Sequence, residues 1–153
     1  MTTANHSNQS QLLKGAAVGG IINGIINGII NWFTLDKEST IYLTDDSISS
    51  GAHTVFAGAV PLAVSLAFIL TSIAYYSTKK VNKPPYYPVV LKLALKHCVY
   101  AFGIVAIVGI LMQRFAGSVE VSPIGSAIIT GLIAAFVGAI VEYETKTMLA
   151  EKN

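Results

Sequence analysis

Four long stretches of the chain are dominated by apolar residues, and shorter polar or charged segments separate them. Each stretch supplies the roughly 20 predominantly apolar residues that a helix needs to cross the hydrocarbon core of a bilayer. The pattern therefore predicts an all-α integral membrane bundle of four transmembrane helices in a single domain. The predicted spans are residues 12–33, 54–76, 89–113 and 123–143.

Two proline positions refine these spans. Ser122 followed by Pro123 is a typical N-cap and first-turn pair, and it predicts where the fourth helix begins. Pro61 lies inside the second span, where it removes a backbone donor, and we expect a kink near Ala57.

The connecting segments differ in charge. Residues 1–11 are rich in Ser, Thr, Asn and Gln, and we expect a flexible tail there. Eight of the ten Lys and Arg residues lie on the side of this tail, of the 77–88 connection and of the C-terminus, and two lie on the opposite side. The positive-inside rule then places both termini and the 77–88 loop in the cytoplasm, and residues 34–53 form an outer loop.

Composition supports a membrane protein. Hydrophobic residues make up 53% of the chain and charged residues only 12%, whereas soluble domains carry about 25% charged residues. The net charge of +2 is too small to indicate a nucleic-acid partner. Cys98 is the single cysteine and fits no zinc spacing, so we expect no disulfide within the chain, no metal and no cofactor.

The first span contains a four-residue repeat, G-I-I-N, three times between residues 20 and 31. Four residues advance a helix by about 400°, so successive repeats drift by only about 40°. The asparagines therefore share one band, at Asn23, Asn27 and Asn31. The glycines share an overlapping band, at Gly20, Gly24 and Gly28. An unpaired carboxamide is costly in hydrocarbon, so the Asn band should face protein or water and the intervening isoleucines should face lipid.

The Asn band has two interpretations. In the first, the glycines let another helix approach closely and the asparagines form interhelical hydrogen bonds. In the second, the asparagines line a water-filled path and offer donors and acceptors to a solute or ion. Packing is the ordinary explanation, but three asparagines in one band are more than packing requires, so both interpretations stay open.

The fourth span carries small residues in rows four apart. Ser122, Ser126 and Thr130 follow one row. Ala127, Gly131 and Ala135 follow the next. Such rows complement the glycines of the first span, so we expect the first and fourth spans to pack closely, or one of these surfaces to form a homo-oligomer contact.

The start of the third span holds the main ionisable candidates. Lys92 and Lys96 share one helix stripe and can extend to the headgroups. His97 lies deeper, where a histidine is a functional candidate because its charge can change near neutral pH. Glu142, near the end of the fourth span, lies at a comparable depth and is the expected partner of Lys96 or His97. The pair is either a structural ion pair or a proton relay.

Three segments of the chain resemble short four-span bacterial inner-membrane proteins that are labelled permease. They are I-N-G-I-I-N-W-F at 26–33, D-S-I-S-S at 46–50 and H-T-V-F-A-G-A-V-P-L-A-V-S at 53–65. The resemblance implies a multi-pass protein of the bacterial inner membrane with a transport role. It supplies no binding or catalytic residues.

We therefore expect a small permease-like or channel-like protein, acting as an oligomer in the lipid bilayer, that passes a small solute or ion along the Asn band. The alternative is a non-transporting accessory or assembly subunit, whose Gly/Asn surface packs against a partner membrane helix. A membrane enzyme acting on lipid is the least favoured hypothesis. No nucleophile elbow, His-Glu-x-x-His site or phosphate-binding loop occurs in the sequence, so we expect no enzyme.

Overall fold

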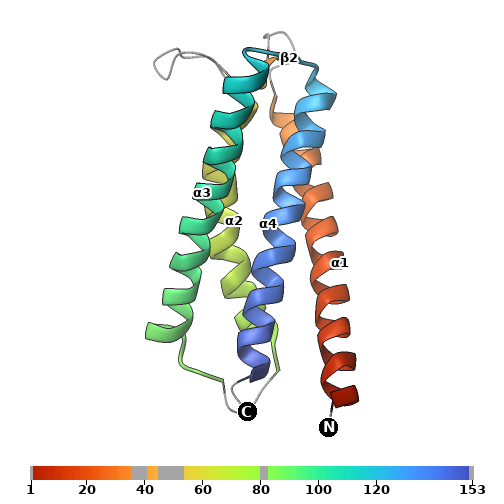
Figure 1. Cartoon of the computed structure of the whole chain (residues 1–153), viewed down its shortest axis with the longest axis vertical. Helices are drawn as coiled ribbons and strands as arrows, with labels where there is room; N and C mark the ends of the chain where they lie inside the picture. Colours follow the sequence, from red (N-terminus) through yellow and green to blue (C-terminus); the bar gives the residue numbers. More distant parts are fainter. Residues whose placement is uncertain (1, 36–40, 45–53, 80–82, 152–153) are drawn as a thin grey trace.

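The computed structural model describes residues 2–35, 41–44, 54–79 and 83–151. Within them the chain forms four helices, each long and apolar enough to cross a membrane. The helices are α1 (Thr2–Thr34), α2 (Val55–Ser77), α3 (Leu91–Ala116) and α4 (Pro123–Glu151), and a short kinked segment, η1 (Tyr86–Val90), leads into α3. The predicted four-helix architecture is confirmed. α1 begins and α4 ends at the same end of the molecule (Figure 1), as an even number of spans requires.

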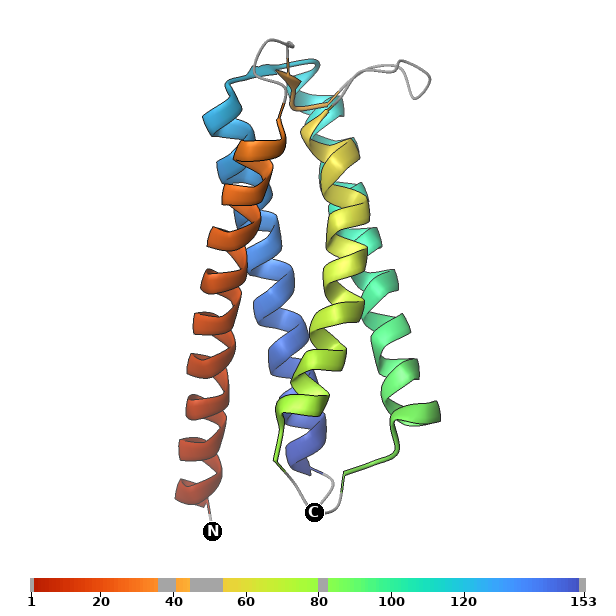
Figure 2. The same ribbon diagram turned by 180° about the vertical axis from the view of Figure 1, so that it is seen from behind.

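The helices form an open arrangement around α4. α1 packs along α4, α2 packs against both α4 and α3, and α3 makes few contacts with α4. Figure 1 shows α3 and α1 on opposite sides of α4, and Figure 2, from behind, shows α2 beside α4 on the side away from α1. The four helices therefore do not surround one closed core.

Small residues of α2 allow its neighbours to approach. Ala59, Ala63 and Ala67 are fully buried and follow one another at intervals of four residues, so they line one face of the helix. Thr71 continues this row and is also fully buried. Larger buried side chains from α3 and α4, such as Val105 and Val141, pack against the alanines.

A short two-stranded sheet joins the two connections at the end opposite the termini. β1 (Ile41–Tyr42) pairs antiparallel with β2 (Glu120–Val121), with Ile41 opposite Val121. The Leu43 N–H extends this pairing by donating to the Val119 carbonyl at 2.8 Å. The sheet ties the chain between α1 and α2 to the α3–α4 loop.

The helix boundaries bear on several expectations. The N-cap prediction is confirmed, because α4 begins at Pro123 and the Gly125 N–H donates to Ser122 Oγ at 3.1 Å. Residues 2–11, where we expect a flexible tail, belong to α1, and their flexibility stays a prediction. That stretch contains no proline or glycine to stop a helix that continues into the apolar span. α4 likewise runs past the expected end at residue 143.

The structure does not test the predicted kink in α2 or the full extent of the two predicted loops. α2 continues through Pro61, and the kink near Ala57 stays a prediction. Most of the outer loop expected over 34–53 lies outside the described residues, as does part of the 77–88 loop.

Candidate functional site

The Asn band of α1 faces the protein. Asn23, Asn27 and Asn31 are half-buried. The six isoleucines between residues 21 and 30 are 51 to 58% exposed. The predicted orientation, with amides toward protein and isoleucines outward, is therefore confirmed.

Each amide of the band takes part in a hydrogen bond within the chain. Asn23 Nδ2 donates to the Ala134 carbonyl of α4 at 2.8 Å. Asn27 Nδ2 donates to the carbonyl and side-chain oxygens of Asn23, at 2.8 and 3.0 Å. Ser126 Oγ of α4 donates to Asn31 Oδ1 at 3.4 Å. This geometry favours the packing interpretation of the Asn band.

The glycine band explains why α1 and α4 approach so closely. A Cβ added at Gly20 would lie 2.6 Å from the Ala135 carbonyl oxygen, and one at Gly24 would lie 2.7 Å from that of Gly131. A Cβ at Gly131 would lie 2.9 Å from the Gly24 carbonyl oxygen. These distances are shorter than a real Cβ contact allows, so backbone packs on backbone. The prediction that spans one and four pack closely is confirmed.

The rest of the predicted small-residue surface lies in the same interface. A Cβ at Gly28 would lie 3.1 Å from the Ala127 carbonyl oxygen. Ser126 and Thr130 are buried in α4, at 1% and 5% exposure. The α1 and α4 surfaces that we expected to pack or to form an oligomer contact are thus used against each other within one chain.

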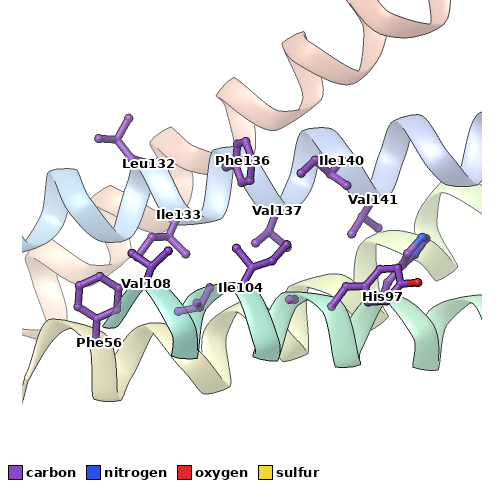
Figure 3. Close-up of a pocket in the computed structure, with 13 residues that line it drawn as sticks. Phe56, His97, Ile104, Val108, Leu132, Ile133, Phe136, Val137, Ile140 and Val141 are labelled. Carbon is purple, nitrogen blue, oxygen red and sulfur yellow. The ribbon is translucent and has the colours of Figure 1, made fainter. Parts of the chain in front are cut away.

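A second feature is an apolar cleft between α3 and α4, with a volume of about 270 Å³. Its walls include Ile104 and Val108 of α3 and Leu132 and Phe136 of α4. Figure 3 shows Phe56 toward one end of the cleft and His97 toward the other. All four wall residues named here are exposed, so the cleft is open at the surface of the chain. We call it the α3–α4 cleft.

His97 connects three helices at its end of the cleft. The side chain is only 2% exposed. Its Nδ1 lies 2.8 Å from the hydroxyl oxygen of Thr71 in α2, and its Nε2 lies 3.1 Å from Oε2 of Glu144 in α4. Thr71 Oγ1 in turn donates to the Ala67 carbonyl at 2.6 Å. Both ring nitrogens therefore have partners.

Glu144 has a second partner, Lys96 of α3. Lys96 Nζ lies 3.8 Å from Glu144 Oε2 and 5.1 Å from the centre of the Tyr100 ring. The Lys96 and Glu144 side chains are 50% and 37% exposed, so the ion pair is partly screened and contributes little by itself. We call His97, Thr71, Glu144 and Lys96 the His97 cluster.

The expected pairing of Glu142 with Lys96 or His97 is wrong. Glu142 pairs with Lys146 on its own helix, and its carboxylate lies against Gly19 of α1. A step of two residues turns a helix by about 200°, so Glu142 and Glu144 point to different neighbours. The depth of His97 pointed to the turn of α4 that does hold its partner, but of the two glutamates in that turn Glu142 faces α1 and Glu144 faces His97.

Sequence reasoning missed Thr71 and Glu144. A signal for Thr71 was present, because it continues the row of alanines at 59, 63 and 67 on the buried face of α2. No comparable signal marked Glu144, since its direction depends on how α4 is rotated between α1 and α3.

Within the described residues no group of three His, Cys, Asp or Glu side chains is placed to hold a metal ion. No family model, curated protein or solved structure matches the chain. The resemblance to short permease-labelled proteins therefore stays a prediction, and the geometry of the two interhelical features carries the functional argument.

Proposed function

We propose that this chain is a small permease-like membrane protein that acts as an oligomer and passes a small solute or ion along the α3–α4 cleft. The observation that carries the proposal is the pair that the buried His97 ring forms with the partly exposed Glu144 at one end of that cleft. Ionisable side chains inside membrane spans are rare and mark pathways or relays by default, because burying them is costly.

The hydrogen bonds of α1 argue against a solute path along the Asn band, which the sequence suggested. The amides of Asn23 and Asn27 already donate within the chain, and α4 covers the glycines beside them. A path along these asparagines requires α1 to separate from α4. The α3–α4 cleft requires no such separation.

The shape of the α3–α4 cleft supports an oligomer. α3 and α4 touch each other little, and the cleft is open on one side. Exposed side chains such as Ile104 and Phe136 border that opening. A second copy of the chain supplies the missing wall, whereas a single chain leaves the cleft open to acyl chains.

Charge distribution and family resemblance support an orientation and a location for the protein. The excess of lysine on the side of the termini supports a cytoplasmic position for that side. The resemblance to permease-labelled proteins supports a bacterial inner membrane and a permease-like role. In this orientation the His97 cluster lies at the cytoplasmic end of the α3–α4 cleft.

A second function is favoured by a different feature. A groove of about 670 Å³ runs between α1 and α4, and its lining includes Gly28, Gly131 and Ala127 together with isoleucines. Its small residues are already packed between α1 and α4, so a partner helix would contact the exposed apolar side chains of the lining, such as Ile128 and Leu132. This groove suits an accessory or assembly subunit that packs against a partner membrane helix and transports nothing.

Reconstitution separates the two functions. Vesicles containing the purified chain are loaded with a pH-sensitive dye to follow proton flux, and their swelling in glycerol or urea follows neutral solutes. The transport proposal expects flux above that of empty vesicles. It also expects Ile104→Trp, which fills the α3–α4 cleft, to abolish the flux.

Ile110→Trp is the matched control, because Ile110 is exposed on the same helix but does not line the α3–α4 cleft. Equal loss in both variants, or no flux with any probe, contradicts transport through this cleft. Crosslinking in native membranes then distinguishes the alternatives, since the transport proposal expects copies of this chain linked together and the accessory function expects a different partner.

A further inference from the structure

We propose that His97 and Glu144 form a proton-binding site, in which the added proton places a hydrogen on Nδ1 of His97 and holds α3 against α4. The proton site stands on the geometry of the His97 cluster alone. Its role in controlling the α3–α4 cleft rests on the proposed function.

The hydroxyl of Thr71 carries a single hydrogen and can therefore donate only once. Its oxygen lies 2.6 Å from the Ala67 carbonyl oxygen, at the short end of the range for an O–H···O hydrogen bond, and the carbonyl can only accept. Thr71 therefore donates to Ala67. It has no second hydrogen for His97 Nδ1, which lies 2.8 Å away.

This assignment requires His97 Nδ1 to be the donor. A ring nitrogen without a hydrogen and a hydroxyl oxygen that has already donated would face each other with lone pairs only. A hydrogen on Nδ1 gives each of these three groups a complementary partner, because Nδ1 donates to the Thr71 oxygen and the Thr71 hydroxyl donates to the Ala67 carbonyl.

The other ring nitrogen completes the proton count. His97 Nε2 lies 3.1 Å from Glu144 Oε2, so one hydrogen must lie between these two atoms. It lies either on Nε2, giving a charged ring beside a carboxylate, or on Glu144, giving a neutral ring beside a carboxylic acid. In both arrangements the pair holds one more proton than a neutral ring with an ionised Glu144.

The neighbouring groups allow the pair to gain and lose this proton. Glu144 faces the ring from α4 and Lys96 approaches from α3, while α2 contributes the uncharged Thr71. Glu144 is 37% exposed, which gives protons a route to the ring from the surface. After the proton leaves, Lys96 still balances the Glu144 carboxylate.

Loss of the proton weakens the connection between α3 and α4. With the proton bound, the hydrogen bond between Nε2 and Glu144 can join a charged ring to a carboxylate, and without it the ring is neutral and the bond is weaker. The hydrogen bond between Nδ1 and Thr71 must also rearrange, because Nδ1 no longer has a hydrogen to donate. Little direct contact holds α3 to α4 elsewhere, because the α3–α4 cleft separates them. We therefore expect the cleft to be narrower when the pair is protonated and wider when it is not.

The proton site is tested by ¹⁵N NMR of the histidine ring in the full chain, embedded in lipid. The sequence contains three histidines, so His6→Gln with His53→Gln leaves only His97. At about pH 6, slightly below the ordinary histidine pKa of about 6.5, we expect the Nδ1 signal to show an attached proton, and we expect raising the pH to remove this proton reversibly. An Nδ1 that carries no proton at any pH between about 5 and 8 overturns the proposal.

Two variants of Thr71 show whether the hydroxyl is responsible. Thr71→Ser keeps an acceptor for Nδ1 and should retain the Nδ1 proton at about pH 6. Thr71→Val removes the acceptor at nearly the same side-chain size, and in this variant His97 should lose the Nδ1 proton at the same pH. Retention of the Nδ1 proton in both variants contradicts the assignment of Thr71 as the acceptor.

The control of the cleft is tested by spin labels at Ile104 and Phe136, on its two walls, in a Cys98→Ala chain. We expect the distance distribution to shift to longer values between about pH 6 and about pH 8, and the shift to vanish in His97→Gln. Should His97→Gln fail to fold, Glu144→Gln is the replacement. A distribution that does not change with pH overturns the control of the cleft while leaving the transport proposal intact.

Discussion

Asn23 donates its side-chain amide to the carbonyl oxygen of Ala134 at 2.8 Å, and the bond joins α1 to α4 across 111 positions of sequence. Asn23 itself accepts from the amide of Asn27, so the two asparagines form a short hydrogen-bonded chain that ends on the backbone of α4. A carboxamide committed in this way is part of the helix interface. It explains how a polar band can be accommodated in a helix that is apolar enough to cross a membrane.

Removing the Asn23 side chain should weaken the α1–α4 interface. Interhelical hydrogen bonds in membranes contribute about 0.6 kcal/mol on average and up to about 2 kcal/mol, so we expect Asn23→Ala to lower the free energy of unfolding within that range. Asn31→Ala should cost less, because its bond from Ser126 is longer, at 3.4 Å. Unfolding in mixed detergent measures both. An equal or larger effect of Asn31→Ala contradicts this ranking.

Two glycines should respond in opposite directions to the same substitution. Gly24→Ala places a Cβ 2.7 Å from the Gly131 carbonyl oxygen and should destabilise the protein by about 1–3 kcal/mol, as overpacking does. Gly103→Ala meets nothing within 4 Å and should stabilise α3 by about 0.5–1 kcal/mol through helix propensity. Thermal unfolding in detergent gives the two signs. Stabilisation by Gly24→Ala is incompatible with direct backbone packing between α1 and α4.

The two glutamates of α4 should differ in importance. Glu144→Ala leaves the buried His97 ring without its Nε2 partner, and we expect a loss of about 1–3 kcal/mol of stability. Glu142→Ala removes a pair with Lys146 within one helix and should cost less than about 1 kcal/mol. Measured under the same conditions, a larger cost for Glu142→Ala would restore the partner that the sequence suggested.

The N-cap of α4 is open to a direct test. Ser122→Ala removes the acceptor for the Gly125 N–H and should destabilise the protein by about 1 kcal/mol. Ser122→Asp restores an acceptor at the N-terminal end of the helix and should recover most of the loss. If Ser122→Asp is no more stable than Ser122→Ala, the hydroxyl has another role.

Features that depend on short-range pattern were predictable from the sequence. The apolar stretches predict the four helices, Ser122 and Pro123 predict the start of α4, and the repeat in α1 predicts which of its sides meets protein. Small residues at intervals of four on both α1 and α4 also predict that these helices pack together. In each case the signal is a spacing of residues that can be read within a few turns of each helix by itself.

Features that depend on the relative rotation of helices were not predictable. His97 was identified by its depth, but its partners, Thr71 and Glu144, come from two other helices. A rotation of α4 by about half a turn would exchange Glu144 for Glu142. The β1–β2 pairing has a similar origin, because strands of two residues carry almost no periodicity and form where two loops meet.

The amide band of α1 packs against α4, and the proposed path for a solute follows the α3–α4 cleft instead. Labelling of single cysteines with a membrane-impermeant maleimide, in native membranes and a Cys98→Ala background, shows which of the two surfaces is in contact with water. We predict that Ile104→Cys in the cleft reacts about tenfold faster or more than Ile110→Cys, the lipid-facing control on the same helix, and that Asn27→Cys stays as slow as the control. Fast labelling at position 27 with protection at position 104 would contradict the account.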